Sequence, residues 1–342
     1  MPLPREQGTE RRAPPFVKSQ RDPTDPQNAR TTRRTTDIIT PDRRCEYWPV
    51  LRCKNIMKMP KLLKADLSLL LIALIWGSTF IVVKKSLVQC SPILFIALRF
   101  WVGTAALIML MPRALRGLDL STLRRGLVLA AFLLGGFIFQ TLGLRGTSSS
   151  RSAFITSLVV LLVPTLGYFV YRRWPRIRTL IGVVLATIGL GMLTLNTIPM
   201  NLTFGDGLTG ICAIVFALHI LFIGRYLPES DFRQLAIIQM AGGALLCTLL
   251  LMPLETPFLV PDMYFYIYLL ISGVLATGFA YYMQVKAQRD TTPNRTALIF
   301  SLEPFFAALV ANLVLGEGIT RKGWIGGLFI VGGILISEYR RK

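Results

Sequence analysis

Residues 140–158 read QTLGLRGTSSSRSAFITSL, and residues 284–302 read QVKAQRDTTPNRTALIFSL. A constant offset of 144 residues relates the two stretches without a gap and continues through residue 191. Leucine and alanine often coincide between apolar helices, whereas Gln, Arg, Thr and Ser rarely do. The matched positions of these types include Gln140 with Gln284, Arg145 with Arg289, Thr147 with Thr291, Arg151 with Arg295 and Ser157 with Ser301. We interpret the chain as a duplicated unit.

The composition indicates a membrane protein. Of the 342 residues, 53% are hydrophobic and 16% are charged, whereas a soluble domain carries a larger charged share. Apart from Arg99, the Lys and Arg residues after Lys54 lie at or between apolar runs, where water or lipid headgroups would meet them. The formal net charge of +20 therefore mainly reflects how the basic connections are distributed between the two sides of the membrane. We expect the lipid bilayer as a partner and no nucleic acid.

The first part of the chain differs from the rest. Residues 1–56 are rich in Arg, Thr, Pro and Asp without helical or strand periodicity, so we expect a disordered basic tail. They contain no apolar core of the length that a secretory signal needs. Two origins stay open. One is an upstream extension of the reading frame, because Met57 or Met59 opens a conventional short lead into the first apolar run; the other is a genuine tail that lies on anionic lipid.

The remainder divides into ten apolar runs. A helix needs roughly 20 apolar residues to cross a hydrocarbon core of about 30 Å. We predict spans at 66–84, 91–112, 122–143, 152–171, 177–195, 206–225, 233–253, 263–285, 295–315 and 322–339. On one side of the membrane the connections carry Lys84, Lys85, Arg145, Arg151, Arg321 and Lys322. The other side carries about three times as many Lys and Arg residues, which predicts that both termini are cytoplasmic.

The duplication predicts an inverted arrangement. Residues 64–195 and 206–339 would each form a repeat of five spans, and an odd number of crossings makes the second repeat enter the membrane from the opposite side. The expected fold is an all-α membrane protein with ten transmembrane helices as two inverted five-helix repeats. Such repeats can enclose a site near the midplane and open it alternately to either face, which suits transport.

Four segments resemble one transporter family. They are Leu74-Ile-Trp-Gly-Ser-Thr-Phe80, Ala97-Leu-Arg-Phe100, the run from Ser152-Ala-Phe154 to Pro164, and Ala297-Leu-Ile-Phe-Ser-Leu-Glu-Pro304. They resemble the EamA-type drug/metabolite transporters over nearly all of residues 64–339. The resemblance implies a bacterial inner-membrane carrier of small metabolites, often an exporter, with a central cavity between two five-helix halves.

Two charged residues inside predicted spans are the main site candidates. Glu303 lies about two turns inside its span, where a carboxylate must pair, line a wet cavity or be protonated. It would serve in proton coupling or in binding a substrate amine, or it would cap a broken helix beside Pro304 or pair with Arg99. Arg99 would hold an anionic substrate group, or it would be an internal tether to a carbonyl or to Glu303.

Polar and aromatic residues supply further candidates. His219 is the only histidine, and it would relay protons or form a plain interhelical hydrogen bond. Gln140 and Gln284 occupy matching depths from opposite surfaces, where two gates could lie. Aromatic walls suit amphiphilic or cationic metabolites, although such side chains also face lipid or other helices. The candidates for the cavity wall are Trp76, Ser78, Tyr281 and Tyr282.

Other classes of function find less support. The five cysteines fit neither a disulfide framework nor a zinc pattern, and we expect no metal and no cofactor. The spans contain no HExxH pattern, acidic metal cluster, Gly-Xaa-Ser-Xaa-Gly elbow or Walker loop, so we do not expect an enzyme. Small-residue faces around Gly182 and Gly326 suit packing within a monomer or, as a weaker alternative, a weak homodimer.

These observations predict a secondary transporter. It would export or exchange a small metabolite, amino-acid-like or a similar polar solute, by alternating access, with protons as a candidate coupled ion. The alternatives are a multidrug or cation efflux carrier and a non-transporting membrane receptor. The small multidrug members of the same superfamily use a glutamate in their first helix, and residues 67–83 contain no acid, which weighs against a drug pump of that kind.

Overall fold

The computed structural model of the protein describes residues 59–194, 201–315 and 319–338. The predicted tail at residues 1–56 lies outside these described residues. Within them the chain is helical and forms no β-strand, apart from one isolated bridge between Cys90 and Leu259. The all-α prediction is therefore confirmed for this part of the chain.

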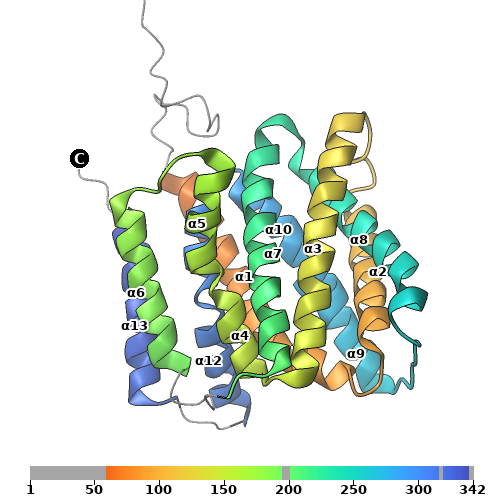
Figure 1. Ribbon diagram of the computed structural model, residues 1–342. Helices are drawn as coiled ribbons and strands as arrows, with labels where there is room; N and C mark the ends of the chain where they lie inside the picture. The colour runs from red at the N-terminus through yellow and green to blue at the C-terminus, as the bar shows by residue number, and fades with distance from the viewer. Residues whose placement is uncertain (1–58, 195–200, 316–318, 339–342) are drawn as a thin grey trace, which may run out of the picture. The chain divides into compact units, whose positions relative to one another are not determined.

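Thirteen α-helices and two other helical segments follow one another along the described parts of the chain (Figure 1). They are α1 (Met59–Ser86), α2 (Pro92–Leu110), α3 (Leu120–Gly146), α4 (Ser149–Ser157), α5 (Val159–Tyr171), α6 (Ile177–Thr194), α7 (Phe204–Tyr226), the 3-10 turn η3 (Leu227–Glu229), α8 (Phe232–Leu254), α9 (Met263–Leu270), the π-helical segment η4 (Ile271–Phe279), α10 (Ala280–Gln288), α11 (Pro293–Phe300), α12 (Glu303–Leu315) and α13 (Arg321–Glu338).

Eight helices in the described ranges are long and apolar enough to cross a membrane. They are α1, α2, α3, the α4–α5 pair, α6, α7, α8 and the continuous run α9–η4–α10. The predicted span at 295–315 is divided into α11 and α12 and forms no single long helix. The last predicted span corresponds to α13, which has 18 residues and includes Arg321, Lys322 and Glu338. Length and apolar composition therefore support eight crossings directly.

Helix starts follow local sequence. The side chains of Asp119, Thr203, Asp231 and Asp262 each accept a hydrogen bond from a backbone N–H in the first turn of the helix that follows. Such caps satisfy donors that have no partner within the helix. Ser148 caps α4 by accepting from the Arg151 N–H, and Thr292 caps α11 by accepting from the Arg295 N–H. The last two caps occupy matched positions of the repeated sequence.

Two helices are interrupted at corresponding positions. The backbone N–H of Leu158, between α4 and α5, donates to the Ile155 carbonyl at 3.1 Å. That of Leu302, between α11 and α12, donates to the Ile299 carbonyl at the same distance. These are i→i−3 bonds, which tighten the helix locally and change its direction. The offset of the repeat therefore relates the two breaks as well as the two caps.

Helices α6 and α13 pack closely and antiparallel. A Cβ added to Gly182 would lie 2.5 Å from the Gly333 carbonyl oxygen, and one added to Gly326 would lie 2.5 Å from the Gly189 oxygen. The early part of each helix therefore meets the late part of the other. Only glycine permits such a close backbone approach.

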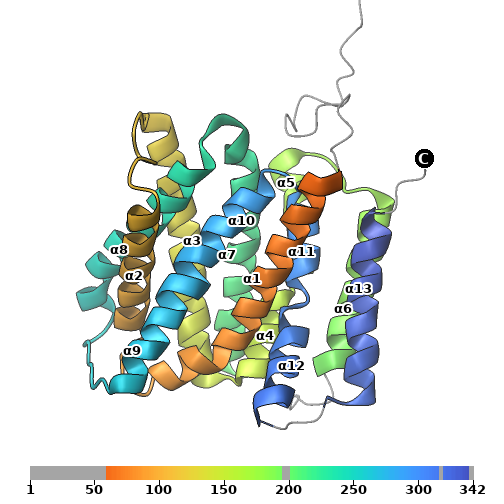
Figure 2. The same ribbon diagram turned by 180° about the vertical axis from the view of Figure 1, so that it is seen from behind.

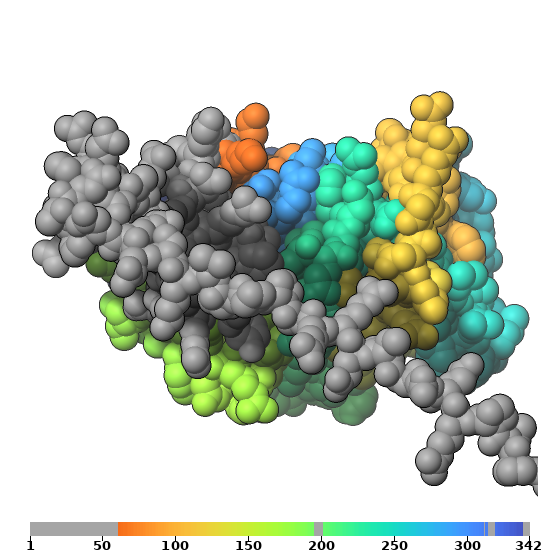
Figure 3. Space-filling view, turned by 90° about the horizontal axis from the view of Figure 1, so that it is seen from above, coloured from red at the N-terminus to blue at the C-terminus, as the bar shows by residue number. Residues whose placement is uncertain are grey.

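The first described helix begins at the same end of the bundle at which the last one ends. Figure 2 shows the start of α1 and the end of α13 there. Figure 3 looks onto this end, where α10 lies between α1 and α7 and contacts both. Helices of residues 59–194 contact helices of residues 201–338 at many places in the described part of the chain, for example α3 with α7 and α1 with α12.

Candidate functional site

A cavity lies in the middle of the helices. It contains about 760 Å³ of space between atoms, part of which is open to solvent. Residues of α1, α2, α3, α4, α5, α7, α10, α11 and α12 line it, so both matched stretches contribute to its wall. The part that a water molecule can enter is about 70 Å³, which is smaller than a typical small-molecule site.

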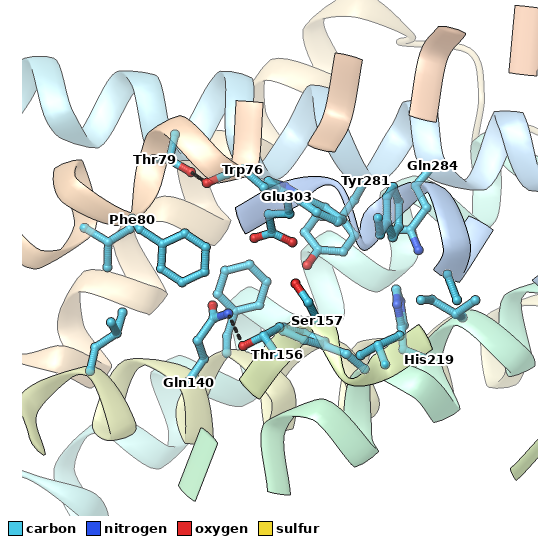
Figure 4. Close-up of a pocket in the computed structure, with 18 of the residues that line it drawn as sticks. Trp76, Thr79, Phe80, Gln140, Thr156, Ser157, His219, Tyr281, Gln284 and Glu303 are labelled. Atoms are coloured by element: carbon cyan, nitrogen blue, oxygen red, sulfur yellow. Dashed lines mark hydrogen bonds between the residues drawn. The ribbon is translucent and has the colours of Figure 1, made fainter. Parts of the chain in front are cut away.

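Glu303 is a buried carboxylate of this cavity that makes no ion pair. It is the first residue of α12 and is 6% exposed. Its side chain makes no hydrogen bond or ion pair with any residue that the structure describes. Figure 4 shows Glu303, Tyr281 and Ser157 pointing toward the same space. The Ser157 Oγ is also buried and has no hydrogen-bond partner in the described part of the chain. Unpartnered polar atoms that share a cavity can accept a ligand.

Arg99 lies in the cavity wall, and side-chain and backbone groups of η4 and α3 hold its guanidinium in place. Its Nε donates to the Thr277 Oγ1 at 2.9 Å, and its Nη2 donates to the Ser272 carbonyl at 3.5 Å. The guanidinium carbon lies 4.5 Å from the centre of the Phe137 ring. Among the described residues, Glu303 included, Arg99 forms no ion pair within 4.0 Å. The contacts leave Nη1 without a hydrogen bond to any described residue.

The π-helical segment η4 supplies the acceptor groups that hold the cavity wall. Thr277 Oγ1 donates to the Ser272 carbonyl at 2.7 Å and accepts from Arg99. Trp76 donates its indole N–H to the Ala276 carbonyl at 2.9 Å. Because π-helical turns shift backbone bonds, they leave carbonyls for side-chain donors at functional sites.

An aromatic wall surrounds the Glu303 side of the cavity. The Trp76 ring lies 5.0 Å from the Tyr281 ring and 4.9 Å from the Phe300 ring, between centres. Phe137 lies 5.7 Å from Tyr281. The tilted contacts at these distances hold the rings against one another in the cavity wall.

His219 and the two glutamines also line the cavity. His219 Nε2 lies 2.9 Å from Gln239 Oε1 on α8, which is the interhelical contact expected of a structural histidine. Gln140 Nε2 donates to Thr156 Oγ1 at 3.4 Å, and Gln284 Nε2 donates to Gln288 Oε1 at 3.3 Å. The matched glutamines therefore both face the cavity but have different partners.

Seven of the nine predicted site residues share this cavity: Trp76, Arg99, Gln140, His219, Tyr281, Gln284 and Glu303. Ser78 and Tyr282 do not belong to its wall. Ser78 donates its hydroxyl to the Ile75 carbonyl within α1, and Tyr282 packs near Phe232.

Sequence reasoning missed several wall residues. Thr156 and Phe300 carry no distinctive sequence signal, and Phe137 is one of many aromatic residues in apolar runs. Ser157 could have been found, because it belongs to the repeated stretch and matches Ser301. In the described residues no group of three His, Cys, Asp or Glu side chains could hold a metal ion.

Comparisons with known proteins agree on one family. The sequence profile of the EamA-like transporter family matches residues 63–195 and again residues 203–339. An uncharacterized transporter of Archaeoglobus fulgidus is 34% identical over 280 residues, which cover 82% of this chain and 87% of that protein. The uncharacterized transporter YoaV of Bacillus subtilis is 24% identical, with 82% of this chain and all of that protein covered.

One solved structure shares the fold. It superposes with a TM-score of 0.67 at 18% sequence identity and covers 80% of this chain and 96% of that chain. At this identity the likeness concerns the fold alone.

Proposed function

Because the chain belongs to the EamA-like transporter family, we propose that this multi-pass membrane transporter is a secondary carrier that exports or exchanges a small amino-acid-like zwitterion by alternating access. We place it in the bacterial inner membrane with both termini in the cytoplasm. The main observation behind this proposal is that one cavity contains both the unpaired carboxylate of Glu303 and the guanidinium of Arg99, whose Nη1 makes no hydrogen bond to a described residue.

The chemistry of the wall supports a zwitterion. Glu303 would accept hydrogen bonds from a substrate ammonium group, with Ser157 as a neutral neighbour. Arg99 would donate to a substrate carboxylate from Nη1 while Thr277 and Phe137 hold the guanidinium. Charges of opposite sign in one poorly solvated cavity favour a ligand that carries both, because either ligand charge alone leaves one wall group uncompensated. Glu303 is also the group that would carry a coupling proton.

Alternating access in this kind of carrier uses two inverted repeats. We therefore extend the proposal to ten membrane spans, with one repeat at residues 64–195 and the other at residues 206–339. Matching caps at Ser148 and Thr292 support it, as do matching breaks at Leu158 and Leu302. The α6–α13 contact adds a second line of support. Gly182 meets Gly333, which is the match of Gly189, while Gly189 meets Gly326, which is the match of Gly182. A two-fold axis across the helices produces such reciprocal pairs.

Orientation follows from charge and from the chain ends. The described helices begin and end at one end of the bundle, as an even number of crossings requires. The excess of Lys and Arg on that side supports a cytoplasmic location for it. The enclosing membrane supplies lipid on the outer faces of the helices.

A cation carrier is the second candidate. The observation that favours it is the group of aromatic rings, Trp76, Tyr281 and Phe300, beside a carboxylate, which is a common way to bind an ammonium or quaternary amine. In that case Arg99 would be structural and would not contact the substrate.

Counterflow in proteoliposomes tests these proposals. A thermal-shift screen of amino acids on purified protein selects the probe family; for leucine, the matched set is leucine, 3-methylbutylamine and 4-methylpentanoate. We expect the intact amino acid to accumulate and both singly charged analogues to accumulate poorly. Equal accumulation of the amine would favour the cation carrier. Binding without movement of any probe would indicate a receptor and contradict the transport proposal.

A further inference from the structure

A groove on the outside of the bundle lies between the start of α6 and the end of α13. It is lined by Arg178 and Ile181 of α6 and by Leu335 and Ile336 of α13, and it contains about 680 Å³ of space between atoms, part of which is open to the surroundings. The three apolar residues are between 39% and 63% exposed. In a membrane-spanning chain such residues face lipid, so the groove presents an apolar wall with an arginine beside it.

The groove lies beside a close backbone contact. Gly182 follows Ile181 and packs against the Gly333 carbonyl, and a Cβ added to Gly182 would also lie 3.0 Å from the Ser337 Cβ. Figures 1 and 2 show α6 and α13 side by side at one edge of the bundle. Each of these two helices contacts the other far more than it contacts the rest of the described chain. A ligand in the groove would therefore add contacts to a peripheral helix pair.

The connection from α5 into α6 is strongly basic. Four of the seven residues from 172 to 178 are arginine, and residues 120–205 contain no Asp or Glu. Arg172 and Arg176 are exposed, and Arg176 directly precedes the first residue of α6. Arg178 follows two positions later and lines the groove. A phosphate group at this end of the groove would meet charge of the opposite sign from donors that suit it.

Basic charge is denser at this end of the α6–α13 pair than at the matched end. Beyond Glu338, the last residue of α13, the sequence adds three basic residues at 340–342. The offset of the repeat matches residues 172–178 with residues 316–322, which read GEGITRK and contain two basic residues and one acid. Basic charge alone reflects orientation in the membrane. Together with a groove between two helices, it is typical of a site for an anionic lipid headgroup.

An exposed tryptophan in the same connection indicates its depth in the membrane. Trp174 is 71% exposed, and its ring stacks on that of Tyr168 with 4.5 Å between centres. The backbone of Arg172 is left-handed, with a φ of 52°, which ends α5 and turns the chain toward α6. Tryptophan is enriched at the level of lipid headgroups. The arginines of this connection would therefore lie at headgroup level, about one helical turn from Ile181.

We propose that the groove between α6 and α13 binds an anionic phospholipid, with an acyl chain against Ile181, Leu335 and Ile336 and the phosphate against the arginines of the α5–α6 connection. A zwitterionic phospholipid fits less well, because its ammonium group repels the same arginines. A free phosphate lacks the acyl chain that the groove accommodates. The site lies outside the central cavity, and the inference rests neither on the class of substrate nor on alternating access.

Photocrosslinking in lipid vesicles tests the proposal on the full-length protein. The photoreactive residue p-benzoylphenylalanine replaces Leu335, and the protein is reconstituted in phosphatidylglycerol with an excess of phosphatidylcholine. Mass spectrometry of the adducts gives the ratio of the two lipids at this position relative to the vesicle. One arginine near an anionic headgroup strengthens binding about fivefold, so the Leu335 adducts should be enriched in phosphatidylglycerol at least about fivefold.

A leucine of similar exposure provides the matched position. Leu120 is 61% exposed, against 63% for Leu335, and it begins α3 next to the basic α2–α3 connection. Figure 1 shows the start of α3 at the same end of the bundle but away from α6 and α13. Its adducts should be clearly less enriched. Equal enrichment at both positions would show a general attraction to the basic side and would overturn the proposal.

Charge variants test the arginines. Arg172→Gln with Arg176→Gln should bring the Leu335 adducts close to the vesicle ratio, because two contributions of about fivefold each are lost. Arg113→Gln with Arg116→Gln removes the same charge from exposed arginines of the α2–α3 connection and should leave these adducts unchanged. Equal effects of the two double variants would contradict the site. If a variant is not monodisperse, added salt should lower the enrichment in the parent, and an enrichment insensitive to salt would contradict the charge contact.

Two further readouts concern the occupant of the groove. Glycerol phosphate, which has no acyl chain, should compete poorly with phosphatidylglycerol for the Leu335 position, and efficient competition would overturn the role of the groove. Adducts between two protein chains in place of lipid adducts would assign the groove to a second copy and overturn the proposal. Counterflow tests the proposed transport separately, so the two proposals can fail independently.

Discussion

Neutralising Glu303 should separate binding from stability. The Glu303→Gln change keeps the shape of the side chain and removes its charge. Glu303 is 6% exposed and has no partner among the described residues, so the change breaks no ion pair and removes the cost of burying a charge. We therefore expect the melting temperature of the purified protein to stay the same or to rise.

Binding should change in the opposite direction. A hydrogen bond to a charged group is worth about 1.5–3 kcal/mol. Two charges about 4 Å apart interact by about 4 kcal/mol at an effective dielectric constant of 20, before desolvation is subtracted. A net loss of about 2 kcal/mol corresponds to roughly thirtyfold weaker binding of a zwitterion.

Calorimetric binding and thermal unfolding in one detergent provide the assay. The selected amino acid is titrated into parent and Glu303→Gln protein, and the melting temperatures are compared. Asp206→Asn is the contrasting variant, because Asp206 accepts hydrogen bonds from three donors and its neutralisation should lower the melting temperature. A lower melting temperature for Glu303→Gln would show a structural role, and unchanged affinity would remove the carboxylate from the binding site.

Three further predictions concern packing, a thiol and the guanidinium. Gly182→Val should destabilise the protein by about 1–3 kcal/mol, because the valine side chain would collide with the Gly333 carbonyl in the α6–α13 contact. Thermal unfolding measures this loss, and an unchanged melting temperature would contradict the prediction. Burial, with a smaller contribution from a nearby carboxylate, raises the pKa of the Cys90 thiol to about 12. Its thiolate fraction at neutral pH should be about a thousandfold below that of an ordinary thiol, so peptide-mapped iodoacetamide labelling should increase sharply on unfolding, and fast labelling of folded protein would refute the burial argument. Arg99→Lys protein should fold but bind the zwitterion at least about tenfold more weakly, because an ammonium group lacks the planar, forked donors with which a guanidinium can bind Thr277 and a carboxylate together. Titration calorimetry measures this loss, and parental affinity would assign Arg99 a structural role.

Much of the fold could be predicted from the sequence because burial in a bilayer imposes a simple pattern. Apolar runs long enough to cross a bilayer marked most helices, and the constant offset between matched residues marked two halves. The division of the ninth predicted span into α11 and α12 was harder to predict. It depends on an i→i−3 bond at Leu302, although the neighbouring Pro304 signalled a disturbance.

The site was less predictable because the rotation of each helix is set by packing. Successive residues on a helix point about 100° apart, so Tyr281 faces the cavity while Tyr282 packs near Phe232. The π-helical segment that holds Arg99 could not be seen, since it rests on a bond from Thr277 to Ser272 that has no pattern in sequence.

The most direct test of the central claim is the sidedness of two matched residues. Arg145 and Arg289 are both exposed and occupy matched positions of the repeated sequence. Single cysteines at these positions would be labelled with an impermeant maleimide in intact cells and in inverted vesicles. Inverted repeats predict that Arg145→Cys reacts from outside the cell and Arg289→Cys only in inverted vesicles. Reaction of both cysteines from the same side would contradict the inversion and the alternating carrier built on it.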